Sequence, residues 1–379
     1  MIDRFLKIRE NSEQLCEPLM IEDYSLQACE FVSPPKWHLA HSTWFLKEFI
    51  LTKYAENYIL YNEYFHFLFN SYYNNVGKRV LRPARGLMSR PAVAEVYKYR
   101  KYVTAAMIAF LHTHPKKETL AISEIGNNQE EQHQELLVYN IKYILGNQPT
   151  FPAYQDSFKT KVEIHAAGFI KINAGLYEIG HQENGFCFDN ELERHKVYVN
   201  DFEISNTLIT NQEYLDFILA GGYQNFNLWH DDGRSWITSS KIEAPLYWYK
   251  IDNEWWNYTL SGLEKVVLDL PVMHISFYEA FAYSERKGCR LPTEFAWEIV
   301  SDKFQWGQLW GWTNCAYLAY PGFSKSPIVL GEYNGKFMIN QMILRGGSVA
   351  TPEGHSRKTY RNFFPPDMRW QFGGLRLAK

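Results

Sequence analysis

The fold is decided by the stretch KETLAISEIGNNQEEQHQELLVYNIKYILG, which occupies residues 117–146. Apolar residues recur in it at spacings of three and four, the pattern of an amphipathic helix. We expect a helix over 117–145 that ends at Gly146, because glycine commonly follows a helix C-terminus. The same spacing predicts three earlier helices, near residues 2–17, 36–54 and 90–113. Four helices of this length form a bundle.

A long connection separates the second predicted helix from the third. It covers roughly residues 55–89 and is rich in aromatic and basic side chains. The third helix begins at Ser89-Arg90-Pro91, since serine is a good N-cap and proline is tolerated in the first turn. Loops of this length inside a compact domain usually have a function, so we expect this one to contribute to a site.

The character of the sequence changes after a linker, GNQPTFP, at residues 146–152. Beyond the linker come short β-type runs and two short helices, near 168–172, 196–204, 211–219 and 276–287. We therefore predict two domains. A helical bundle covers 1–150, and an α+β domain covers 151–379, with its structured part beginning at about residue 160.

The composition is that of an ordinary folded protein. A chain of 379 residues and 44.6 kDa suggests two or three domains. Hydrophobic residues make up 46% and charged residues 21%, which is enough for buried cores. The 39 basic and 42 acidic residues give a net charge of −3, and no polybasic run occurs. Neither nucleic acid nor an anionic membrane is therefore an expected partner.

Cysteine usage and the apolar runs indicate a cytoplasmic protein. The five cysteines are far apart and form no C-x-x-C pair, which is typical of free thiols in a reducing compartment. The chain becomes charged at Asp3-Arg4, where a signal peptide needs its apolar segment. The longest apolar run, near 105–111, is far shorter than the roughly 20 residues that cross a bilayer.

Two motifs on the predicted helices carry the residue types of a metal site. Trp37-His38-Leu39-Ala40-His41 lies in the second helix, and Gln129 to Glu135, QEEQHQE, lies in the fourth. Helical spacing places both histidines of the first motif on one face, and Gln129, Glu130 and His133 on another. Facing helices of a bundle can converge such side chains on one metal ion. For each histidine alone, a hydrogen-bonded core or surface role is the simpler interpretation.

Residues of the long connection and of the C-terminal region add candidate substrate contacts. Arg82 and Arg85 can present two guanidinium groups to a carboxylate, although salt bridges that anchor the loop would use the same spacing. Tyr72 and Tyr73 can donate hydroxyl hydrogens, since phenol stays protonated near neutral pH, and a structural role is the alternative. The aromatic cluster within 360–376 offers a surface to an apolar or cationic ligand, and packing explains it equally well.

Taken together, these segments resemble the ergothioneine-biosynthesis sulfoxide synthases (EgtB type), relatives of the ovothiol and selenoneine C–S and C–Se bond-forming enzymes. The matching stretches include SPPKWHLAH, FNSYY, RPARGLMSRP and QHQELL and run in family order over nearly the whole chain, at 33–41, 69–73, 82–91, 132–137, 271–298, 331–347 and 360–376. The resemblance implies a DinB-like four-helix bundle fused to a domain of the formylglycine-generating-enzyme fold, which is C-type-lectin-like.

The resemblance also implies an activity and a metal. Family members bind ferrous iron through three histidines and use O2 to join a thiol sulfur to the imidazole C2 carbon of hercynine, which gives a sulfoxide. By position, His41 is the first ligand and His133 the last. The middle ligand of the family lies four residues before the last, where this chain has Gln129. A neutral amide oxygen is a weaker ligand for Fe(II) than imidazole, so iron affinity should fall.

The departure at Gln129 leaves several interpretations open. The amide oxygen of Gln129 completes the site, or Glu130 completes a two-His-one-carboxylate triad resembling that of non-haem iron oxygenases. Alternatively, the chain is a catalytically impaired homologue that binds a betaine or an amino acid. A selenoneine-type C–Se synthase would differ in the second substrate. Formylglycine-generating activity itself is rejected, because it needs a late cysteine pair and no cysteine follows Cys315.

The resemblance assigns the thiol contacts to the long connection. Arg82 and Arg85 match the pair that grips the carboxylate of the thiol substrate, either cysteine or γ-glutamylcysteine. Tyr72 and Tyr73 match positions near the iron, where in one branch of the family a tyrosine hydroxyl supplies a proton or a hydrogen bond.

The resemblance assigns the hercynine contacts to both predicted domains. Gln132 and Asn362 match residues that hold the hercynine imidazole or carboxylate. Phe363 and Phe364, with Trp370, offer aromatic faces to the trimethylammonium group, with cation–π energies of about 0.5–2 kcal/mol.

Overall fold

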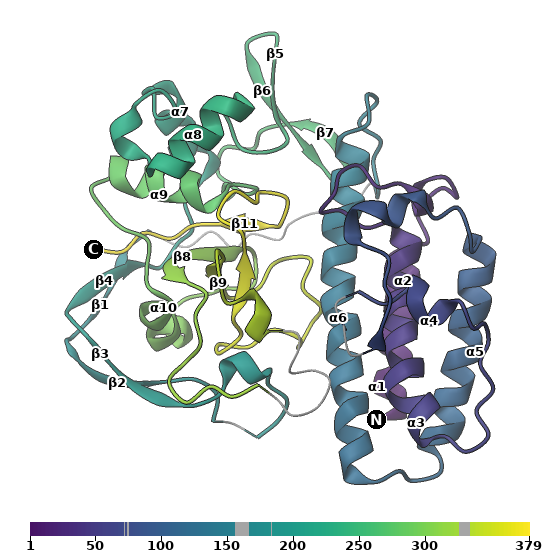
Figure 1. The fold of residues 1–379 in the computed structure, drawn as a ribbon. Coiled ribbons are helices and arrows are strands. Elements are labelled where there is room, and N and C mark those ends of the chain that lie inside the picture. The colour runs from purple at the N-terminus through teal and green to yellow at the C-terminus, as the bar shows by residue number, and fades with distance from the viewer. Residues whose placement is uncertain (72, 74–75, 156–166, 183, 326–333) are drawn as a thin grey trace. The chain divides into compact units, whose positions relative to one another are not determined.

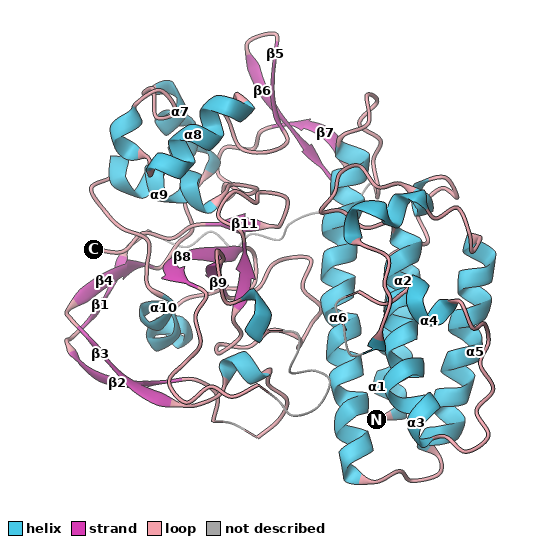
Figure 2. Ribbon diagram, viewed as in Figure 1, coloured by secondary structure: helices cyan, strands magenta, loops and turns pink. Residues whose placement is uncertain are grey.

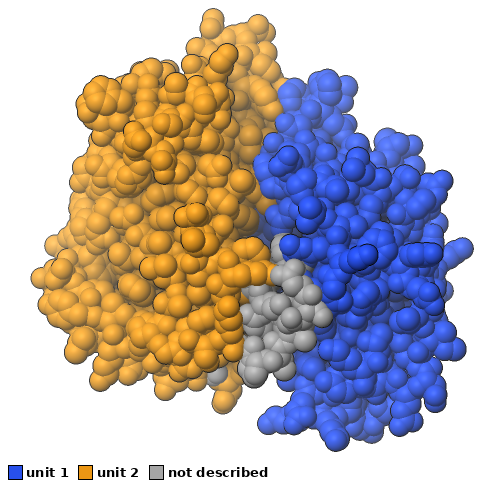
Figure 3. Space-filling model, in the orientation of Figure 1, with its two compact units in different colours: residues 1–157, 260–262, 350–355 blue, residues 158–259, 263–349, 356–379 orange. Residues whose placement is uncertain are grey.

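The helices predicted for the first part of the chain are present in a computed structural model, which describes residues 1–379 except 72, 74–75, 156–166, 183 and 326–333 (Figure 1). The chain divides into two units (Figure 3). The first comprises Met1–Ser157, Leu260–Gly262 and Ala350–His355, and the second comprises Phe158–Thr259, Leu263–Val349 and Ser356–Lys379. Two short segments from the later chain thus belong to the helical unit, which a single division at 150/151 does not anticipate.

The first unit is built from helices (Figure 2). Their bounds, with 3-10 or π segments labelled η, are α1 Ile2–Gln14, η1 Asp23–Ser25, α2 Pro35–Leu46, η2 Lys47–Leu51, α3 Thr52–Tyr54, α4 Phe65–Leu68, η4 Arg82–Leu87, α5 Val93–Leu111 and α6 Lys117–Gly146. The longer ones, α1, α2, α5 and α6, pack against one another.

Helix α2 is the central element of this unit, because every residue from Pro35 to Leu46 is buried. Its neighbour α6 is buried over most of its second half, whereas α5 buries one stripe. On α5 the stripe includes Val96, Val103 and Met107, all fully buried and spaced by seven and four residues. Each buried aliphatic side chain of this kind contributes about 1.5–3 kcal/mol, so tertiary packing of these stripes holds the helices together.

Three predicted helix bounds require correction. The helix expected over 36–54 divides into α2, the π segment η2 and the short α3, since a π turn interrupts the regular hydrogen bonds after Leu46. The helix expected from Ser89 begins at Val93, because its N-cap Ala92 still has an extended conformation, with φ −66° and ψ 159°. The helix expected to reach residue 17 ends at Gln14.

The second unit combines small sheets with short helices (Figure 2). Its elements are β1 Phe169–Ile172, β2 Gly175–Ile179, η5 Asp189–Glu191, β3 His195–Val199, β4 Phe202–Ser205, α7 Asn211–Leu219, η6 Phe226–Leu228, α8 Asp231–Ser240, β5 Trp248–Ile251, β6 Glu254–Thr259, β7 Gly262–Lys265, α9 Phe277–Arg286, α10 Glu294–Val300, η7 Ser301–Lys303, β8 Trp310–Ala316, η9 Gly335–Phe337, β9 Met342–Arg345, β10 Asn362–Phe364 and β11 Gly373–Gly374.

The largest described sheet has the strand order β10-β9-β8-β11, in which β11 runs parallel to β8 and the other pairs are antiparallel. Trp310 and Trp312 of β8 are fully buried in the main core of this unit. Helix α9 packs against β8. A capping box, in which Ser276 accepts from the Glu279 N–H and the Glu279 side chain accepts from the Ser276 N–H, fixes the start of α9.

The sequence predicted this unit only in outline. Helices α7 and α9 are confirmed, but α8 and α10 were missed. The run expected over 196–204 is two strands, β3 and β4, which pair with different partners, β2 and β1. No helix in the described part of the chain has both the length and the hydrophobicity that a bilayer crossing requires.

Candidate metal centre

Helices α2 and α6 bring His41 and His133 together, as the motifs predicted. Their ring centroids lie 4.7 Å apart. Two imidazoles bound to one ion, with metal–nitrogen bonds of about 2.1 Å at angles between 90° and 109°, have centroids roughly 4.6–5.3 Å apart. The observed spacing lies in this range, so the two rings are close enough to share one metal ion.

The hydrogen bond of His41 leaves its outer nitrogen ready to bind a cation. His41 Nδ1 lies 2.6 Å from the carbonyl oxygen of Phe69. A carbonyl can only accept, so Nδ1 carries the hydrogen and Nε2 keeps its lone pair. Histidines that bind metals commonly donate their other N–H to a backbone carbonyl in this way. His41 is therefore already in the tautomer that a metal ligand needs.

Stacking on both faces fixes the plane of the His41 ring. Trp37 stacks on it with a centroid distance of 4.5 Å and an interplanar angle of 11°, and Trp44 stacks with 5.5 Å and 16°. The guanidinium of Arg85 lies over the Trp37 ring at 3.4 Å. Trp37, Trp44 and the guanidinium of Arg85 thus hold His41 in one orientation.

Gln129 carries a buried amide oxygen on the same helix as His133. It lies four residues before His133 on α6, which places both side chains on the same helix face. Gln129 is only 8% exposed, and its Oε1 has no hydrogen-bond partner among the described residues. A buried acceptor without a partner costs about 1–3 kcal/mol, and a cation would remove that cost. The donor set of two imidazoles and one amide oxygen fits a divalent iron ion.

No group of three or more His, Cys, Asp or Glu side chains is placed to hold a metal ion within the residues that the structure describes.

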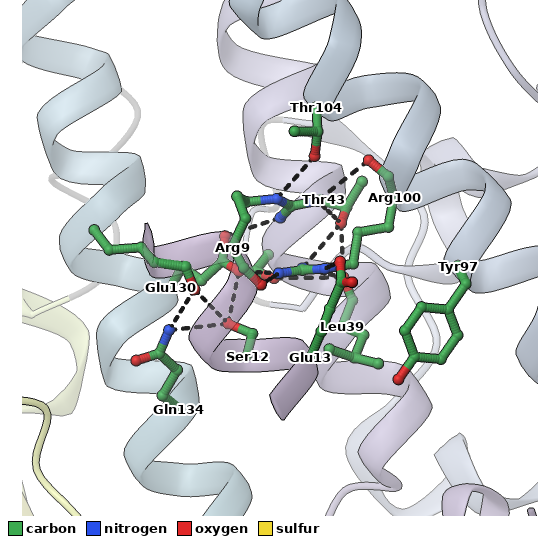
Figure 4. Close-up of polar contacts among 12 residues, drawn as sticks. Arg9, Ser12, Glu13, Leu39, Thr43, Tyr97, Arg100, Thr104, Glu130 and Gln134 are labelled. Atoms are coloured by element: carbon green, nitrogen blue, oxygen red, sulfur yellow. Dashed lines mark hydrogen bonds and ion pairs between the residues drawn. The ribbon is translucent and has the colours of Figure 1, made fainter. Parts of the chain in front are cut away.

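Glu130 does not belong to this site, which corrects the alternative that it completes a carboxylate triad. Its Oε1 accepts hydrogen bonds from Arg100 Nη2 at 2.5 Å and from Ser12 Oγ at 2.7 Å, and its Oε2 accepts from Arg9 Nη1 at 2.9 Å (Figure 4). Burial raises the pKa of the Glu130 carboxyl, but the charges of Arg100 and Arg9 outweigh burial and lower it to about 2. Glu130 is a buried structural anion, already satisfied by two arginines.

A third histidine, His38, lies beside His133 with a ring centroid distance of 5.1 Å. Its Nδ1 is 2.9 Å from Nδ1 of His133, and its Nε2 is 2.6 Å from Nδ2 of Asn140. The sequence identified His38 but gave it no role, and it gave no sign of Asn140. The only signal for Asn140 is its position seven residues, or two helical turns, after His133.

All three imidazoles are held neutral. Burial lowers the pKa of His38, His41 and His133 well below the usual value of histidine, and the positive charge of Arg85 lowers each of them further. The charge of Arg82 also lowers the pKa of His38 and of His133. Neutral imidazoles can bind a cation without first losing a proton.

The two predicted arginines differ in their surroundings. Arg85 is 2% exposed and donates from Nη1 to Ser33 Oγ and from Nη2 to Ser71 Oγ, both at 2.8 Å. It therefore anchors the loop through two serine hydroxyls. Arg82 is half-buried, and its carbonyl accepts from Gln27 Nε2 at 2.7 Å.

The tyrosine pair is only partly described. Tyr72 lies outside the described residues. Tyr73 is buried and packs against Trp44, with ring centroids 5.7 Å apart, and against Phe49 at 5.0 Å. Tyr73 is thus one aromatic ring away from His41, since Trp44 stacks on that imidazole.

The remaining predicted contacts lie in separate units. Gln132 is half-buried on α6, next to His133. Asn362, Phe363 and Phe364 form β10 of the second unit and are half-buried. Phe363 stacks on Tyr317 with a centroid distance of 4.1 Å. The Asn362 Oδ1 accepts from the Phe363 N–H at 2.9 Å, which directs its amide nitrogen away from that contact.

Comparisons with known proteins cover both parts of the chain. Residues 154–303 match the family model of the sulfatase-modifying factor enzyme 1-like domain, which confirms the predicted fold class of the C-terminal half. The likeness of the helical unit to DinB proteins stays a prediction.

Among known proteins, three relatives are similar over about half of this chain. Identity is 28% over 242 residues with the hercynine oxygenase of Mycolicibacterium smegmatis, covering 50% of this chain and 55% of that protein. It is 29% over 238 residues with the hercynine oxygenase of Mycobacterium tuberculosis, with the same coverage of 50% and 55%. It is 27% over 232 residues with ergothioneine biosynthesis protein 1 of Schizosaccharomyces pombe, covering 51% and 28%. The chain spans about half the length, or less, of these curated relatives.

Proposed function

Because the chain belongs to the EgtB-type family of ergothioneine biosynthesis, we propose that it is an iron(II)- and O2-dependent sulfoxide synthase. Its reaction joins the imidazole C2 carbon of hercynine to the sulfur of cysteine or γ-glutamylcysteine. The proposal is supported by the convergence of His41 and His133 and by the buried amide oxygen of Gln129, four residues before His133 on α6, which lacks a partner among the described residues.

The ligands in this proposal are His41 through Nε2, His133 through a ring nitrogen, and Gln129 through Oε1. When bound, ferrous iron supplies the one-electron chemistry with O2 that amino-acid side chains lack. The buried rings around the site exclude water, and three protein ligands leave coordination positions open for small molecules. The weak amide ligand predicts an iron affinity below that of a three-histidine site.

The substrate contacts follow from the same region. Arg82 binds the carboxylate of the thiol substrate, and its charge, with that of Arg85, favours an anion near the histidines. Arg85 acts indirectly, since its guanidinium stacks on Trp37, which in turn stacks on His41. Gln132 is adjacent to His133 and can donate an amide hydrogen to the hercynine carboxylate or imidazole.

In the second unit, Asn362, Phe363 and Phe364 carry the groups that a betaine requires. The Asn362 amide can donate to a carboxylate, and Phe363 and Phe364 offer aromatic faces to a trimethylammonium group. Tyr72 or Tyr73 supplies a proton to the reacting oxygen. A tyrosine is suited to this task because its hydroxyl is protonated near neutral pH.

A second candidate function is favoured by Gln129 itself. A chain that has lost one imidazole ligand can keep the pocket and bind a betaine or an amino acid without chemistry. A third candidate is selenoneine-type C–Se bond formation, which differs only in the second substrate. The three candidates separate in one experiment.

The experiment measures iron content and O2 consumption of the protein reconstituted anaerobically with Fe(II), and sulfoxide formation by mass spectrometry. Hercynine is supplied with cysteine, γ-glutamylcysteine or a selenium donor. The variants are Gln129→His, Gln129→Leu and, as a control, Gln14→Leu at an exposed glutamine on α1. The proposal predicts activity in the native chain, higher iron content in Gln129→His and loss of activity in Gln129→Leu. Activity that arises only in Gln129→His would show that the native chain is not an enzyme of this type.

A further inference from the structure

His38 and His133 share one hydrogen through their Nδ1 atoms. These nitrogens lie 2.9 Å apart, which is a hydrogen-bond distance. One nitrogen must donate and the other must accept, so the two rings cannot both carry a hydrogen at Nδ1, nor can both lack it. The tautomer of one neutral imidazole therefore determines the tautomer of the other.

Asn140 determines which ring nitrogen of His38 carries the hydrogen. Its Nδ2 lies 2.6 Å from His38 Nε2, while its Oδ1 accepts from the Ser33 N–H at 3.4 Å. In this orientation the amide donates, so Nε2 of His38 accepts and Nδ1 of His38 carries the hydrogen. That hydrogen is donated to His133 Nδ1, which leaves the neutral His133 with its hydrogen on Nε2. In this arrangement His133 has no lone pair for a metal.

Rotation of the Asn140 amide by 180° reverses the direction of the hydrogen bonds that link Asn140, His38 and His133. Its Oδ1 then accepts from Nε2–H of His38, and His38 Nδ1 accepts from Nδ1–H of His133. One hydrogen leaves His133 Nε2, one is taken up at His38 Nε2, and the shared hydrogen crosses between the two Nδ1 atoms. The number of protons on the two rings is unchanged. Nε2 of His133 now has a lone pair. Because His38 contacts Nδ1 of His133, this Nε2 lone pair is free of that contact.

We propose that His38, directed by Asn140, is a positioning residue that selects the tautomer of His133 and so controls whether this histidine accepts a metal ion. The proposal rests on the proposed role of His133 as a ligand. It differs from the usual arrangement, in which a carboxylate or backbone carbonyl fixes the tautomer of a ligand. His41 has that fixed arrangement through Phe69, whereas His133 has a partner that can either donate or accept.

The first test uses metal-free protein with 15N-labelled histidine and long-range 1H–15N NMR, which reports which ring nitrogen carries the hydrogen. His133 is expected to carry it on Nε2 in the native chain. In Asn140→Asp the carboxylate can only accept, so the hydrogen is expected on His133 Nδ1. An unchanged His133 tautomer in Asn140→Asp would overturn the proposal.

The second test is anaerobic titration with Co(II) followed by visible absorption. His38→Phe keeps the ring but removes both nitrogens, so His133 loses the acceptor that holds its hydrogen on Nδ1 in the metal-binding arrangement, and the loss of such an acceptor typically lowers metal affinity about 10–100-fold. His38→Asn places an amide oxygen near the Nδ1 position and should recover most of that loss. Asn140→Asp should bind Co(II) more tightly than Asn140→Leu. Equal affinities of the native chain, His38→Phe and Asn140→Leu would overturn the proposal.

The control is His112→Ala, at an exposed histidine that ends α5, and it should leave the affinity unchanged. The tautomer is read without metal and without substrates. A reversal in Asn140→Asp therefore supports the inference even where no variant converts hercynine, and failure of the proposed function remains a separate result.

Discussion

The variant Glu130→Gln tests the account of the buried ion cluster that ties the helices of the first unit together. The cluster includes residues from all four longer helices, among them Arg9 on α1, Thr43 on α2, Arg100 on α5 and Glu130 on α6 (Figure 4). The substitution keeps the size of the side chain and one acceptor oxygen but removes the charge. The side chains of Arg9 and Arg100 are 3% and 0% exposed, so Arg9 would stay buried without a carboxylate, while Arg100 would keep the 45% exposed Glu13, 2.8 Å from its Nε.

The expected loss can be worked out in two ways. The fall of the Glu130 pKa from 4.5 to about 2 corresponds to roughly 3 kcal/mol of stabilisation near neutral pH. Removal of one partner from a buried pair typically costs about 3–5 kcal/mol. Both values predict a loss of about 3–5 kcal/mol in the free energy of unfolding of the helical unit.

The effect has a defined pH dependence. Because the folded pKa of Glu130 lies below the ordinary value, its contribution is complete above pH 4.5 and is lost as the pH falls toward 2. The difference between native protein and Glu130→Gln should therefore shrink over that interval.

The assay is urea unfolding followed by circular dichroism, with Glu10→Gln on the exposed face of α1 as a control expected to change stability by less than about 0.5 kcal/mol. A loss in Glu130→Gln below about 1 kcal/mol, or a difference that does not change with pH, would refute the reasoning.

Three further predictions follow from single contacts. Arg82→Ala should raise the KM for the thiol roughly tenfold or more, since a charge-assisted hydrogen bond is worth about 1.5–3 kcal/mol. The KM for hercynine should rise less. Equal increases in the KM of both substrates would contradict the role of Arg82. Arg85→Lys loses the stack on Trp37 and the two serine hydrogen bonds, and should lower the free energy of unfolding by about 1–3 kcal/mol and weaken Co(II) binding. If Arg85→Lys and the exposed-site control Arg90→Lys have the same free energy of unfolding and the same Co(II) affinity, Arg85 does not act as an anchor. Ser276→Ala removes the N-cap of α9 and should cost about 1 kcal/mol in calorimetry, whereas Ser239→Ala on the exposed face of α8 should be neutral.

The sequence predicted the histidines of the candidate metal centre better than the side chains that pack around them. The spacing of three and four residues placed His41 and His133 on helices, and the structure brings the two rings together. The same spacing could not separate Gln129 from Glu130, because neighbouring positions on a helix differ by about 100° and the direction depends on what packs there. The partners that draw Glu130 away, Arg9 and Arg100, are distant in sequence, so no local pattern reveals them.

The second unit was predicted less completely for a related reason. Helix α10, EFAWEIV, has only seven residues and no full apolar period, and α8 contains a glycine and many polar side chains. Strands β3 and β4 follow each other with only Asn200 and Asp201 between them, and so appear as one run. The association of Ala350–His355 with the helical unit depends on tertiary contacts, such as the 2.6 Å hydrogen bond from Thr351 Oγ1 to Glu135 Oε1.

The most direct measurement of the central claim is anomalous diffraction at the iron absorption edge from crystals loaded anaerobically with Fe(II). We predict one iron atom bonded to His41 Nε2, His133 Nε2 and Gln129 Oε1, and its loss in His41→Ala. An iron atom bound at other residues, or none bound while the two imidazoles keep their present positions, would contradict the account.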